Sequence, residues 1–546
     1  MRPARTSNTR HPQFSESNLR KPMLRNFVLI TLRNLRKHRG YSFINIFGRA
    51  TGLAAFMLIL MFVQHETSMD QHHEKGDRIY RVILDAEVMG QTVMTTNTPM
   101  PMAEAFVAEL PELEAATRVD SRAKVLVVVD DIQLYENRFF LVDSTYFDIF
   151  TAELIFGDPR TALTLPNSVV ITEEIAEKYF GDSNPMGRSI NVDRETDYTV
   201  TGIVRFASDR THFRADFLGS MVTHPQVDSP VWLSNSWNTY ILLREDADIA
   251  ALRAKMPGMV TKHVGPDIER FMGQTYEEAK AAGLRYEFAL EKMTDIYLTS
   301  KAEDQLQPTG DVRYVYILSS IALFVLLIAC INFMNLSTAR ASSRAREVGL
   351  RKVFGSQRAQ LIRQFLGESV IMATLSMLIA VVLVAVALPF FEQITGAVLS
   401  ISGPLVLTMI GVTLLTGLLS GLYPAFVLSG FRPVTVLNGS FSTRSKGSFL
   451  RSSLVVFQFA ISIALLISTG IVFKQLRFIQ DRDIGFQKEQ VIVLPLETMA
   501  AREGFEAFRE ELLRNPGVIQ VAAASGLPGP NHIHNSKGFR WESAPA

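Results

Sequence analysis

Five stretches of the chain are apolar over the length that a membrane-crossing helix needs, which is about 20 residues. Four of them contain no charged residue: 315–337, 369–391, 404–430 and 453–473. The fifth, 41–63, contains one charge, Arg49. The pattern therefore predicts five transmembrane helices.

A charged residue within an apolar span, Arg49, requires its own explanation. If it lay outside the membrane, only the apolar run 50–63 would remain of the first span, which is too short to cross a bilayer. We expect its long side chain to snorkel to the cytoplasmic interface. The alternative is a role in a polar interior of the helix bundle.

The residues before the first span carry a different pattern. Segment 23–39 places apolar residues at helical spacing among basic ones, which predicts an amphipathic interfacial helix on the inner membrane surface; the alternative is an ordinary solvated helix. Residues 1–22 are polar and aperiodic, and we expect a disordered cytoplasmic tail. The first span is too long for a cleavable signal peptide.

The basic residues of the short loops set the orientation. The loop 338–368 holds seven Lys and Arg against two acids, and the loop 431–452 holds four against none. The loop 392–403 has neither Lys nor Arg. The N-terminus and both basic loops are thus predicted to be cytoplasmic, with 66–313 and 474–546 on the outer side of the membrane.

Composition agrees with a division between two compartments. The chain has 546 residues, 47% of them hydrophobic and 20% charged. Residues 1–65 carry eleven Lys and Arg against one acid, whereas 66–313 carry 24 against 41 Asp and Glu. This split favours membrane orientation over nucleic-acid binding. The single cysteine, Cys330, allows no disulfide within the chain.

Segment 66–313 has the pattern of a globular domain. Residues 124–129 and 198–204 are typical of β-strands, and Thr172 followed by two glutamates predicts a helix N-cap. Turn residues separate these elements at 157–159 and 181–185. The predicted fold is an α-helical transmembrane bundle with an inserted mixed α/β (α+β) domain.

Catalytic and metal-binding patterns are absent from this domain. A cluster just beyond the first span matches no common zinc spacing, and a solvated stalk helix explains it better than a metal site; its members are His65, Glu66, Asp70, His72, His73 and Glu74. The chain has no phosphate-binding G-x-x-x-x-G-K-[ST] loop. We expect no enzyme and no cofactor, with any ATP bound by a separate subunit.

The most informative stretch is 340–368, called here the coupling segment. Glu347 and Arg351 form an i,i+4 pair among apolar residues, Gly355 is predicted to end this helix, and Ser356 to cap the next. A short, stiff, charged helix between two spans is suited to receive force from a motor domain. The alternative is a basic loop that binds anionic membrane lipid.

Here the sequence resembles the FtsX-like/MacB-like permeases of ABC transporters. The stretch RAREVGLRKVFGSQRAQLIRQFLGES resembles the family's cytoplasmic signature, and residues 140–163 and 167–190 are similar to the MacB-type periplasmic core domain. Residues 45–82, 331–341 and 421–437 match the first span and the exits of two others. Arg49 stands where the family pattern has an apolar residue.

The resemblance implies partners and a mechanism. Such permeases dimerise or carry two halves in one chain, bind two ATPase subunits in the cytoplasm, and transmit the closure of those subunits to periplasmic domains. It also implies that a mechanical, ATPase-contacting role falls on Arg346, Glu347, Gly349, Arg351, Lys352 and Gly355. A periplasmic adaptor or effector protein is a further expected partner, and nucleic acid is not.

A repeat follows the fifth span. Residues 505–525 echo 102–119 as a helix, a proline turn and a short strand, so a second span-plus-domain unit is predicted to begin here; a chance likeness is the alternative. From this we expect 474–546 to be the start of a truncated second periplasmic domain, either in a truncated form of a longer protein with about eight spans or through a disrupted reading frame.

Three functions share this organisation. The first is efflux of an antimicrobial compound, a peptide or a lipid-linked cargo. The second is mechanotransmission without transport, as a signalling or scaffold permease that controls a partner such as a cell-wall hydrolase. The third is sensing of antimicrobial peptides. The coupling segment by itself does not separate them.

Overall fold

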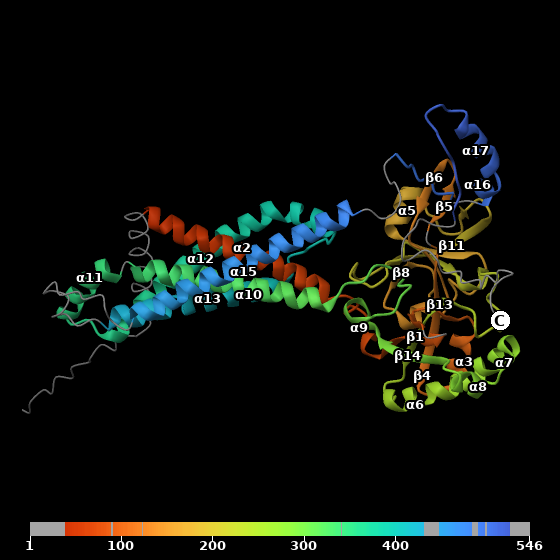
Figure 1. The fold of residues 1–546 in the computed structure, drawn as a ribbon, viewed down its shortest axis with the longest axis horizontal. Helices are drawn as coiled ribbons and strands as arrows, with labels where there is room; N and C mark the ends of the chain where they lie inside the picture. The colour runs from red at the N-terminus through yellow and green to blue at the C-terminus, as the bar shows by residue number, and fades with distance from the viewer. Residues whose placement is uncertain are drawn as a thin grey trace, which may run out of the picture. The chain divides into compact units, whose positions relative to one another are not determined.

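The computed structural model describes residues 39–88, 91–122, 124–339, 341–430, 447–482, 490–496 and 499–524. The chain divides into two compact units (Figure 1). The helical unit contains Met1–Asp77, Arg210–His212 and Glu291–Ile484, and the sheet unit contains Arg78–Asp209, Phe213–Leu290 and Gly485–Ala546. The predicted tail 1–22, nearly all of the interfacial helix 23–39 and residues 431–446 lie outside the described residues.

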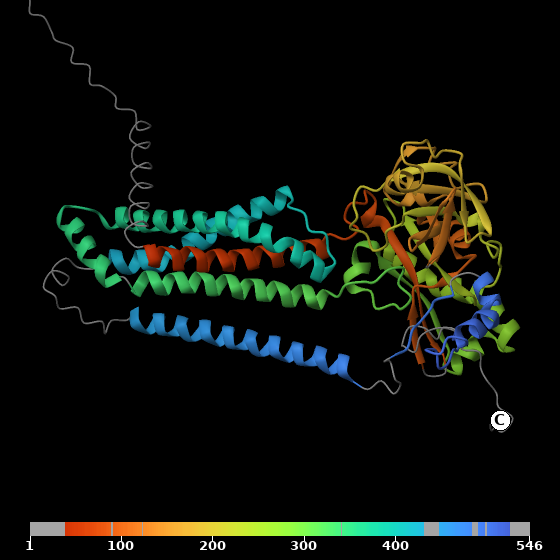
Figure 2. The ribbon, with the colours of Figure 1, turned by 90° about the horizontal axis from the view of Figure 1, so that it is seen from above.

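Five helices of the helical unit are long and apolar enough to span a membrane. They are α2 (Arg39–Thr67), α10 (Val312–Ala339), α12 (Arg358–Thr395), α13 (Gly403–Ser429) and α15 (Gly447–Asp481). The predicted helical bundle is confirmed. Several helices exceed the apolar runs: α12 takes in the last part of the coupling segment, and α15 extends past residue 473. In Figure 2, α15 runs alongside α10.

Small residues bring four of these helices close together. Gly48 and Gly52 of α2 face α10, and a Cβ added at Gly52 would lie 2.7 Å from Ala329 Cβ. Gly417 and Gly421 of α13 face α12, and a Cβ added at Gly421 would lie 2.7 Å from Ser369 Cβ. Both pairs have the small-xxx-small spacing that lets membrane helices pack closely. The packing of α12 on α13 is therefore tight.

The sheet unit is built on one mixed 14-stranded sheet, whose main path is β14-β1-β13-β4-β7-β12-β9-β11-β10-β5-β6. Pairs β9–β11 and β7–β12 are parallel, and the other pairs along this path for which register is given are antiparallel. The strands are β1 (Ile79–Val88), β2 (Gln91–Thr95), β3 (Thr98–Pro99), β4 (Leu113–Arg122), β5 (Val125–Val129), β6 (Ile132–Glu136), β7 (Phe139–Val142), β8 (Glu153–Phe156), β9 (Ser168–Thr172), β10 (Ser189–Val192), β11 (Thr196–Arg205), β12 (Phe217–Ser220), β13 (Asn235–Leu243) and β14 (Arg285–Lys292).

Helices accompany the sheet along the chain, and two apolar clusters form its core. One cluster gathers around Phe106, Trp232 and Phe288, and the other around Phe139 and Trp237. The helices between strands are α3 (Met102–Glu109), α4 (Tyr146–Ile149), α5 (Glu173–Phe180), α6 (Ile249–Met259), α7 (Gly265–Met272) and α8 (Tyr276–Ala281); α9 (Met293–Thr299) follows β14, and α16 (Met499–Glu503) and α17 (Phe505–Leu513) follow α15. The predicted mixed α/β domain is confirmed.

Local predictions in this unit hold in detail. The expected strands form as β5 and β11, and Thr172 Oγ1 accepts a hydrogen bond from the Ile175 N–H at the start of α5. The expectation for 505–525 is only half right. Helix α17 forms, but no strand follows it in the described residues up to 524, where Ile519 is 94% exposed.

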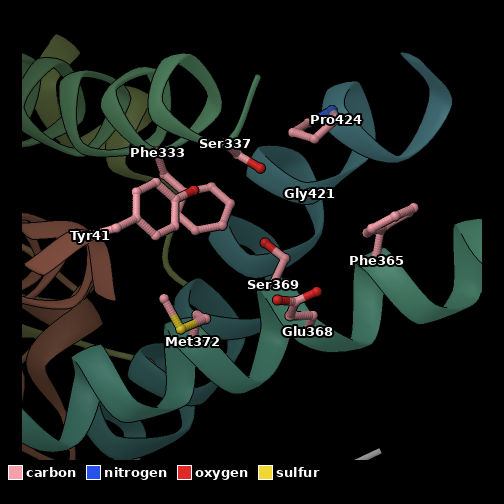
Figure 3. Close-up of a pocket in the computed structure, with 9 residues that line it drawn as sticks. All are labelled: Tyr41, Phe333, Ser337, Phe365, Glu368, Ser369, Met372, Gly421 and Pro424. Carbon is pink, nitrogen blue, oxygen red and sulfur yellow. The ribbon is translucent and has the colours of Figure 1, made fainter. Parts of the chain in front are cut away.

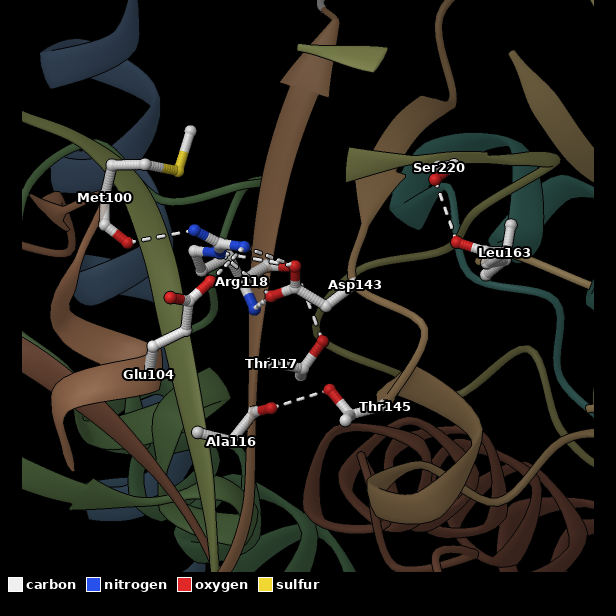
Figure 4. Close-up of polar contacts among 9 residues, drawn as sticks. All are labelled: Met100, Glu104, Ala116, Thr117, Arg118, Asp143, Thr145, Leu163 and Ser220. Carbon is white, nitrogen blue, oxygen red and sulfur yellow. Dashed lines mark hydrogen bonds and ion pairs between the residues drawn. The ribbon is translucent and has the colours of Figure 1, made fainter. Parts of the chain in front are cut away.

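A buried ion pair ties two strands of the sheet together (Figure 4). Arg118 of β4 donates from Nη2 to Asp143 Oδ1 over 2.7 Å and from Nη1 to the Met100 carbonyl over 3.1 Å. The Arg118 backbone N–H also donates to Asp143 Oδ2, 2.6 Å away. Asp143 follows β7 directly, so these bonds hold the ends of β4 and β7 in register. The role is structural, because every bonding partner is internal to the fold.

Candidate functional site: the coupling segment and its attachments

The coupling segment forms a short helix, a tight turn and the start of a long helix. Helix α11 (Ala341–Val353) is closed by a turn at Gly355, whose φ of +91° is left-handed. The Gly355 N–H bonds the Lys352 carbonyl, and the Ser356 N–H bonds the Arg351 carbonyl. This is the Schellman pattern that ends helices at glycine. The predicted helix end is therefore confirmed at Gly355.

The predicted cap at Ser356 is wrong. Helix α12 begins at Arg358, and Gln357 occupies the N-cap position. The Gln357 N–H donates to Gln360 Oε1 across 3.2 Å. Ser356 instead belongs to the closing turn of α11, because its N–H is used there. The sequence favoured Ser356 because serine is the better N-cap residue in isolation.

Two cations attach the coupling segment to the end of α13. Lys352 Nζ donates to the main-chain carbonyl of Ser429 at 2.7 Å, and Arg358 Nε donates to Ser429 Oγ at 3.3 Å. Ser429 is fully buried at the last residue of α13. A carbonyl at a helix C-terminus carries partial negative charge and lacks an intrahelical donor, so a lysine there is favourable.

Apolar residues of α11 divide into two groups. Val348 is buried in a cluster with Leu361, Phe365, Ala425 and Leu428 of α12 and α13. Leu350 and Val353 of α11 are exposed, and so is Phe354 directly after the helix, by 85%. Because Val348 packs inward while Leu350 and Val353 do not, helix α11 has one anchored face and one open apolar face.

Charged residues lie on the same short helix. Arg351 Nη2 bonds Glu347 Oε1 (2.6 Å), and Arg351 Nη1 bonds Gln364 Oε1 (3.0 Å) in α12. Glu347 is exposed, whereas Gly349 is buried. The side chain of Arg346 lies outside the described residues. Of the six residues to which the resemblance gives a mechanical role, Lys352 and Arg351 therefore attach the segment internally, and Glu347 faces outward.

Arg49 lies inside the bundle, and the expectation that it snorkels to the interface is wrong. It is 3% exposed; Nη2 donates to Ser420 Oγ at 2.6 Å, and its guanidinium carbon lies 4.0 Å from the Phe333 ring centroid. Nη1 is 3.4 Å from the Ser369 carbonyl oxygen. Among the described residues, no carboxylate oxygen lies within 4.0 Å of the Arg49 guanidinium, so Arg49 forms no ion pair there. Tertiary packing supplies these hydroxyl and carbonyl partners, and they remove the need to reach water.

A small pocket of about 30 Å³ lies next to this site (Figure 3). Tyr41 and Phe333 line one side, and Glu368 and Ser369 project into it from neighbouring positions of α12. The volume is enough for one or two water molecules. Ser369 Oγ is buried without a protein partner, so it can bind water in this pocket.

The expected solvated stalk helix holds only for His65 and Glu66, which lie in the last turn of α2; the residues after Thr67 form a partly buried turn instead. Helix α2 ends at Thr67, and Asp70 follows in a left-handed conformation with φ of +59° and no exposed surface. Hydrogen bonds from Thr211 Oγ1 and the His212 N–H reach its carboxylate. The His72 and His73 rings lie 4.0 Å apart. Within the described residues, no three His, Cys, Asp or Glu side chains are placed so that they could hold a metal ion together.

Burial shapes the protonation of this cluster. Burial by itself would raise the pKa of Asp70, but the charge and hydrogen bonds of His212 outweigh it and lower that pKa below its usual value. Burial, together with the neighbouring His72, lowers the pKa of His73 to about 3. Burial also lowers the pKa of His72. The two neighbouring histidines are therefore neutral at pH 7.

Comparison with known proteins agrees with this architecture. The family model of the MacB-like periplasmic core domain matches residues 42–258, and that of the FtsX-like permease C-terminal region matches residues 319–433. These two matches place the chain among the membrane permeases of the ABC transporter class. The chain belongs to the FtsX-like/MacB-like permease family.

Individual relatives are distant. The chain is 25% identical over 301 residues to the macrolide export ATP-binding/permease protein MacB of Neisseria gonorrhoeae, covering 54% of this chain and 42% of that protein. It thus spans less than half the length of that relative. It is 22% identical over 437 residues to the uncharacterized ABC transporter permease YvrN of Bacillus subtilis, covering 75% of this chain and 98% of YvrN.

Among solved structures, the periplasmic region of MacB from Actinobacillus actinomycetemcomitans aligns with 40% of this chain and 91% of its own, at 14% identity and a TM-score of 0.27.

Proposed function

We propose that this chain is the permease subunit of an ABC-type efflux or mechanotransmission system. A separate ATPase binds ATP, contacts the coupling segment on the cytoplasmic side, and drives movement of the helices. The sheet unit lies on the periplasmic side of the inner membrane, where the movement acts on cargo or on a partner protein. The excess of Lys and Arg in the loop 338–368 supports this orientation.

The observation that carries the proposal is the two-sided character of α11. One side is fixed by Lys352 to Ser429 and by Val348 to the apolar cluster. The other side exposes Glu347, and Phe354 is exposed directly after the helix. An exposed aromatic beside charged residues is suited to dock in a pocket of another protein. Because the helix is anchored, a push on its open side moves α12 and α13.

The first experiment is purification of the permease from its native membrane with its bound proteins. We expect an ABC ATPase to co-purify, and substitution Glu347→Lys to abolish that association while membrane insertion persists. A matched control is Glu506→Lys, which reverses an exposed glutamate also paired with an arginine, in α17. Co-purification of the ATPase at wild-type yield with Glu347→Lys would contradict the proposed contact.

A second variant tests the apolar part of the contact. Phe354→Ser removes an aromatic ring that is 85% exposed, so the fold loses almost no internal packing. We expect weaker ATPase association with an unchanged unfolding midpoint. The other proteins recovered with the wild-type permease distinguish the two forms of the proposal, since export requires a cargo and partner control requires a periplasmic protein bound in stoichiometric amount.

A further inference from the structure

Three residues between two strands of the sheet unit belong to the helical unit. Strand β11 ends at Arg205 and β12 begins at Phe217, yet Arg210–His212 make their contacts with the helical unit. The Asp70 N–H donates to the Arg210 carbonyl at 2.8 Å. The Asp70 carboxylate accepts from Thr211 Oγ1 at 2.8 Å and from the His212 N–H at 3.1 Å. The segment is thus fixed to the turn that follows α2.

Arg210 extends this attachment to a second place. Its Nη1 donates to Ser68 Oγ, 3.0 Å away, and its Nη2 donates to Ser400 Oγ, 3.1 Å away. Ser68 follows α2, and Ser400 lies in the connection between α12 and α13. One guanidinium group therefore joins the end of the first span to the loop between the third and fourth. The planar, multiply donating arginine head is suited to such a bridge.

The coupling segment and Arg210 are attached to the same pair of helices, α12 and α13. At one end of the pair, Lys352 and Arg358 bond Ser429, the last residue of α13. At the other end, Arg210 bonds Ser400 in the connection that joins α12 to α13. Gly417 and Gly421 hold the two helices in close contact between these ends. Tightly packed helices move together rather than bending independently.

We propose that Arg210–His212 is the output contact of the permease, through which movement of α12 and α13 reaches the sheet unit. Arg210 is a positioning residue, and its bond to Ser400 passes displacement into the chain between β11 and β12. The inference rests on the proposed function, and it adds the place where the force leaves the membrane helices. The bonds to Asp70 hold Arg210–His212 in position, and the bond from Arg210 to Ser400 couples the segment to movement of α12 and α13.

The strain at Asp70 supports a positioned joint. Asp70 is held at a positive φ that costs a non-glycine residue energy, and it is completely buried. A carboxylate without exposed surface needs hydrogen-bond donors, which Thr211 and His212 supply. Specific hydrogen bonds to Asp70 therefore fix the position of Arg210–His212.

The test measures a distance in the permease–ATPase complex in lipid nanodiscs. In a Cys330→Ser background, spin labels at Val398→Cys and Gln133→Cys report the loop between α12 and α13 and strand β6. Labelled chains are diluted with unlabelled ones, so that each measured pair lies within one chain. Distances are compared without nucleotide and with ADP plus vanadate, and ATP hydrolysis is measured in parallel.

We expect the parent to show a nucleotide-dependent shift in the distance, and Ser400→Ala and Arg210→Ala to lose that shift while still hydrolysing ATP. Ser400→Thr keeps the hydroxyl and is expected to restore it. Ser400→Ala leaves the Asp70 bonds in place, so a folding defect is not expected there. Arg205→Ala, which removes an exposed arginine paired with Glu173, serves as the matched control and keeps the shift.

The outcomes separate the two proposals. A wild-type shift in both Ser400→Ala and Arg210→Ala would overturn the output contact and leave the proposed function intact. A parent complex without any nucleotide-dependent shift, or a permease that recruits no ATPase, would overturn the proposed function and the output contact with it. Loss of ATP hydrolysis in Ser400→Ala would also contradict the inference, because the contact lies downstream of the motor.

Discussion

Lys352 Nζ lies 2.7 Å from the main-chain carbonyl oxygen of Ser429, and this bond joins residues 77 positions apart in the sequence. It fixes the last turn of α11 to the last turn of α13. The positive charge sits where the carbonyl groups of a helix end gather negative potential. Lys352 is therefore both an attachment and a complement to the dipole of α13.

Substitution Lys352→Met is expected to loosen α11 without unfolding the bundle. A hydrogen bond that involves a charged group contributes about 1.5 kcal/mol or more, which corresponds to roughly a tenfold change in a local opening equilibrium. Amide hydrogen exchange in 347–353 should rise by about that factor. Lys474→Met, an exposed lysine of α15, is the control. Unchanged exchange in α11 would show that the bond contributes nothing to its attachment.

Gly355 permits a test of backbone conformation alone. Its φ is +91°, and a Cβ added there would meet no atom within 4 Å. Gly355→Ala should therefore destabilise the turn by about 1–2 kcal/mol through the left-handed conformation and not through a clash. Gly355→Asn should cost less, since asparagine tolerates this region better. Amide exchange of the Gly355 and Ser356 N–H groups measures the difference, and equal effects of Ala and Asn would contradict the explanation.

Arg49 is expected to be unnecessary for stability. Placing an arginine in a membrane helix costs about 2.5–3.5 kcal/mol on insertion scales, and its Nε has no hydrogen-bond partner in this bundle. Ser420 Oγ also bonds the Thr416 carbonyl, so it keeps a partner when the arginine is removed. Arg49→Met should therefore keep or raise the thermal unfolding midpoint in detergent. Arg49→Ala, which also leaves a cavity, should lower it.

A clear fall of the midpoint in Arg49→Met would show that the bonds to Ser420 and Ser369 outweigh the cost of burying the charge. In that case Arg49 would be a stabilising link between α2, α12 and α13. An unchanged midpoint would leave a requirement other than stability as the reason for a charge at this position.

Acid is expected to destabilise the turn beyond α2 through its histidines. The folded protein holds the pKa of His73 at about 3, whereas the unfolded chain titrates near the ordinary value of 6.5. Below pH 6.5 the His73 side chain binds a proton in the unfolded state but not in the folded state. Through His73, the free energy of unfolding therefore falls by about 1.4 kcal/mol for each pH unit below 6.5. Above pH 6.5 the contribution of neutral His73 to stability is fully present.

The measurement is chemical unfolding of the detergent-solubilised protein between pH 7.5 and 4.5. His73→Phe keeps a ring against His72 and removes the titration, so its stability should fall less steeply with pH by about one proton. His72 contributes in the same direction, because burial lowers its pKa as well. A pH dependence identical to that of the wild type would contradict the role of His73.

Much of the candidate site was visible in the sequence. Gly355 followed a helical pattern and preceded a polar residue, and only glycine commonly ends a helix in the left-handed region. The Glu347–Arg351 pair followed from helical spacing. The Gly48–Gly52 and Gly417–Gly421 spacings were also present in the sequence, and they could have predicted which helices pack closely.

The remaining features depended on distant segments. In the sequence Ser429 is an ordinary residue at a helix end, and only the fold places Lys352 and Arg358 beside it. Arg49 was expected at the interface because a single helix in lipid offers a cation no partner, and only the neighbours α12 and α13 supply Ser369 and Ser420.

The sequence by itself determined the five apolar helices, the end of α11 and the mixed α/β character of the inserted domain. These follow from runs, periodicities and caps that act within a few residues. The tertiary structure alone decided the interior place of Arg49, the attachment of Lys352 to Ser429, and the docking of Arg210–His212 on Asp70 and Ser400. The physical reason is that charged side chains bond the partners that the fold brings to them, and no local pattern names those partners.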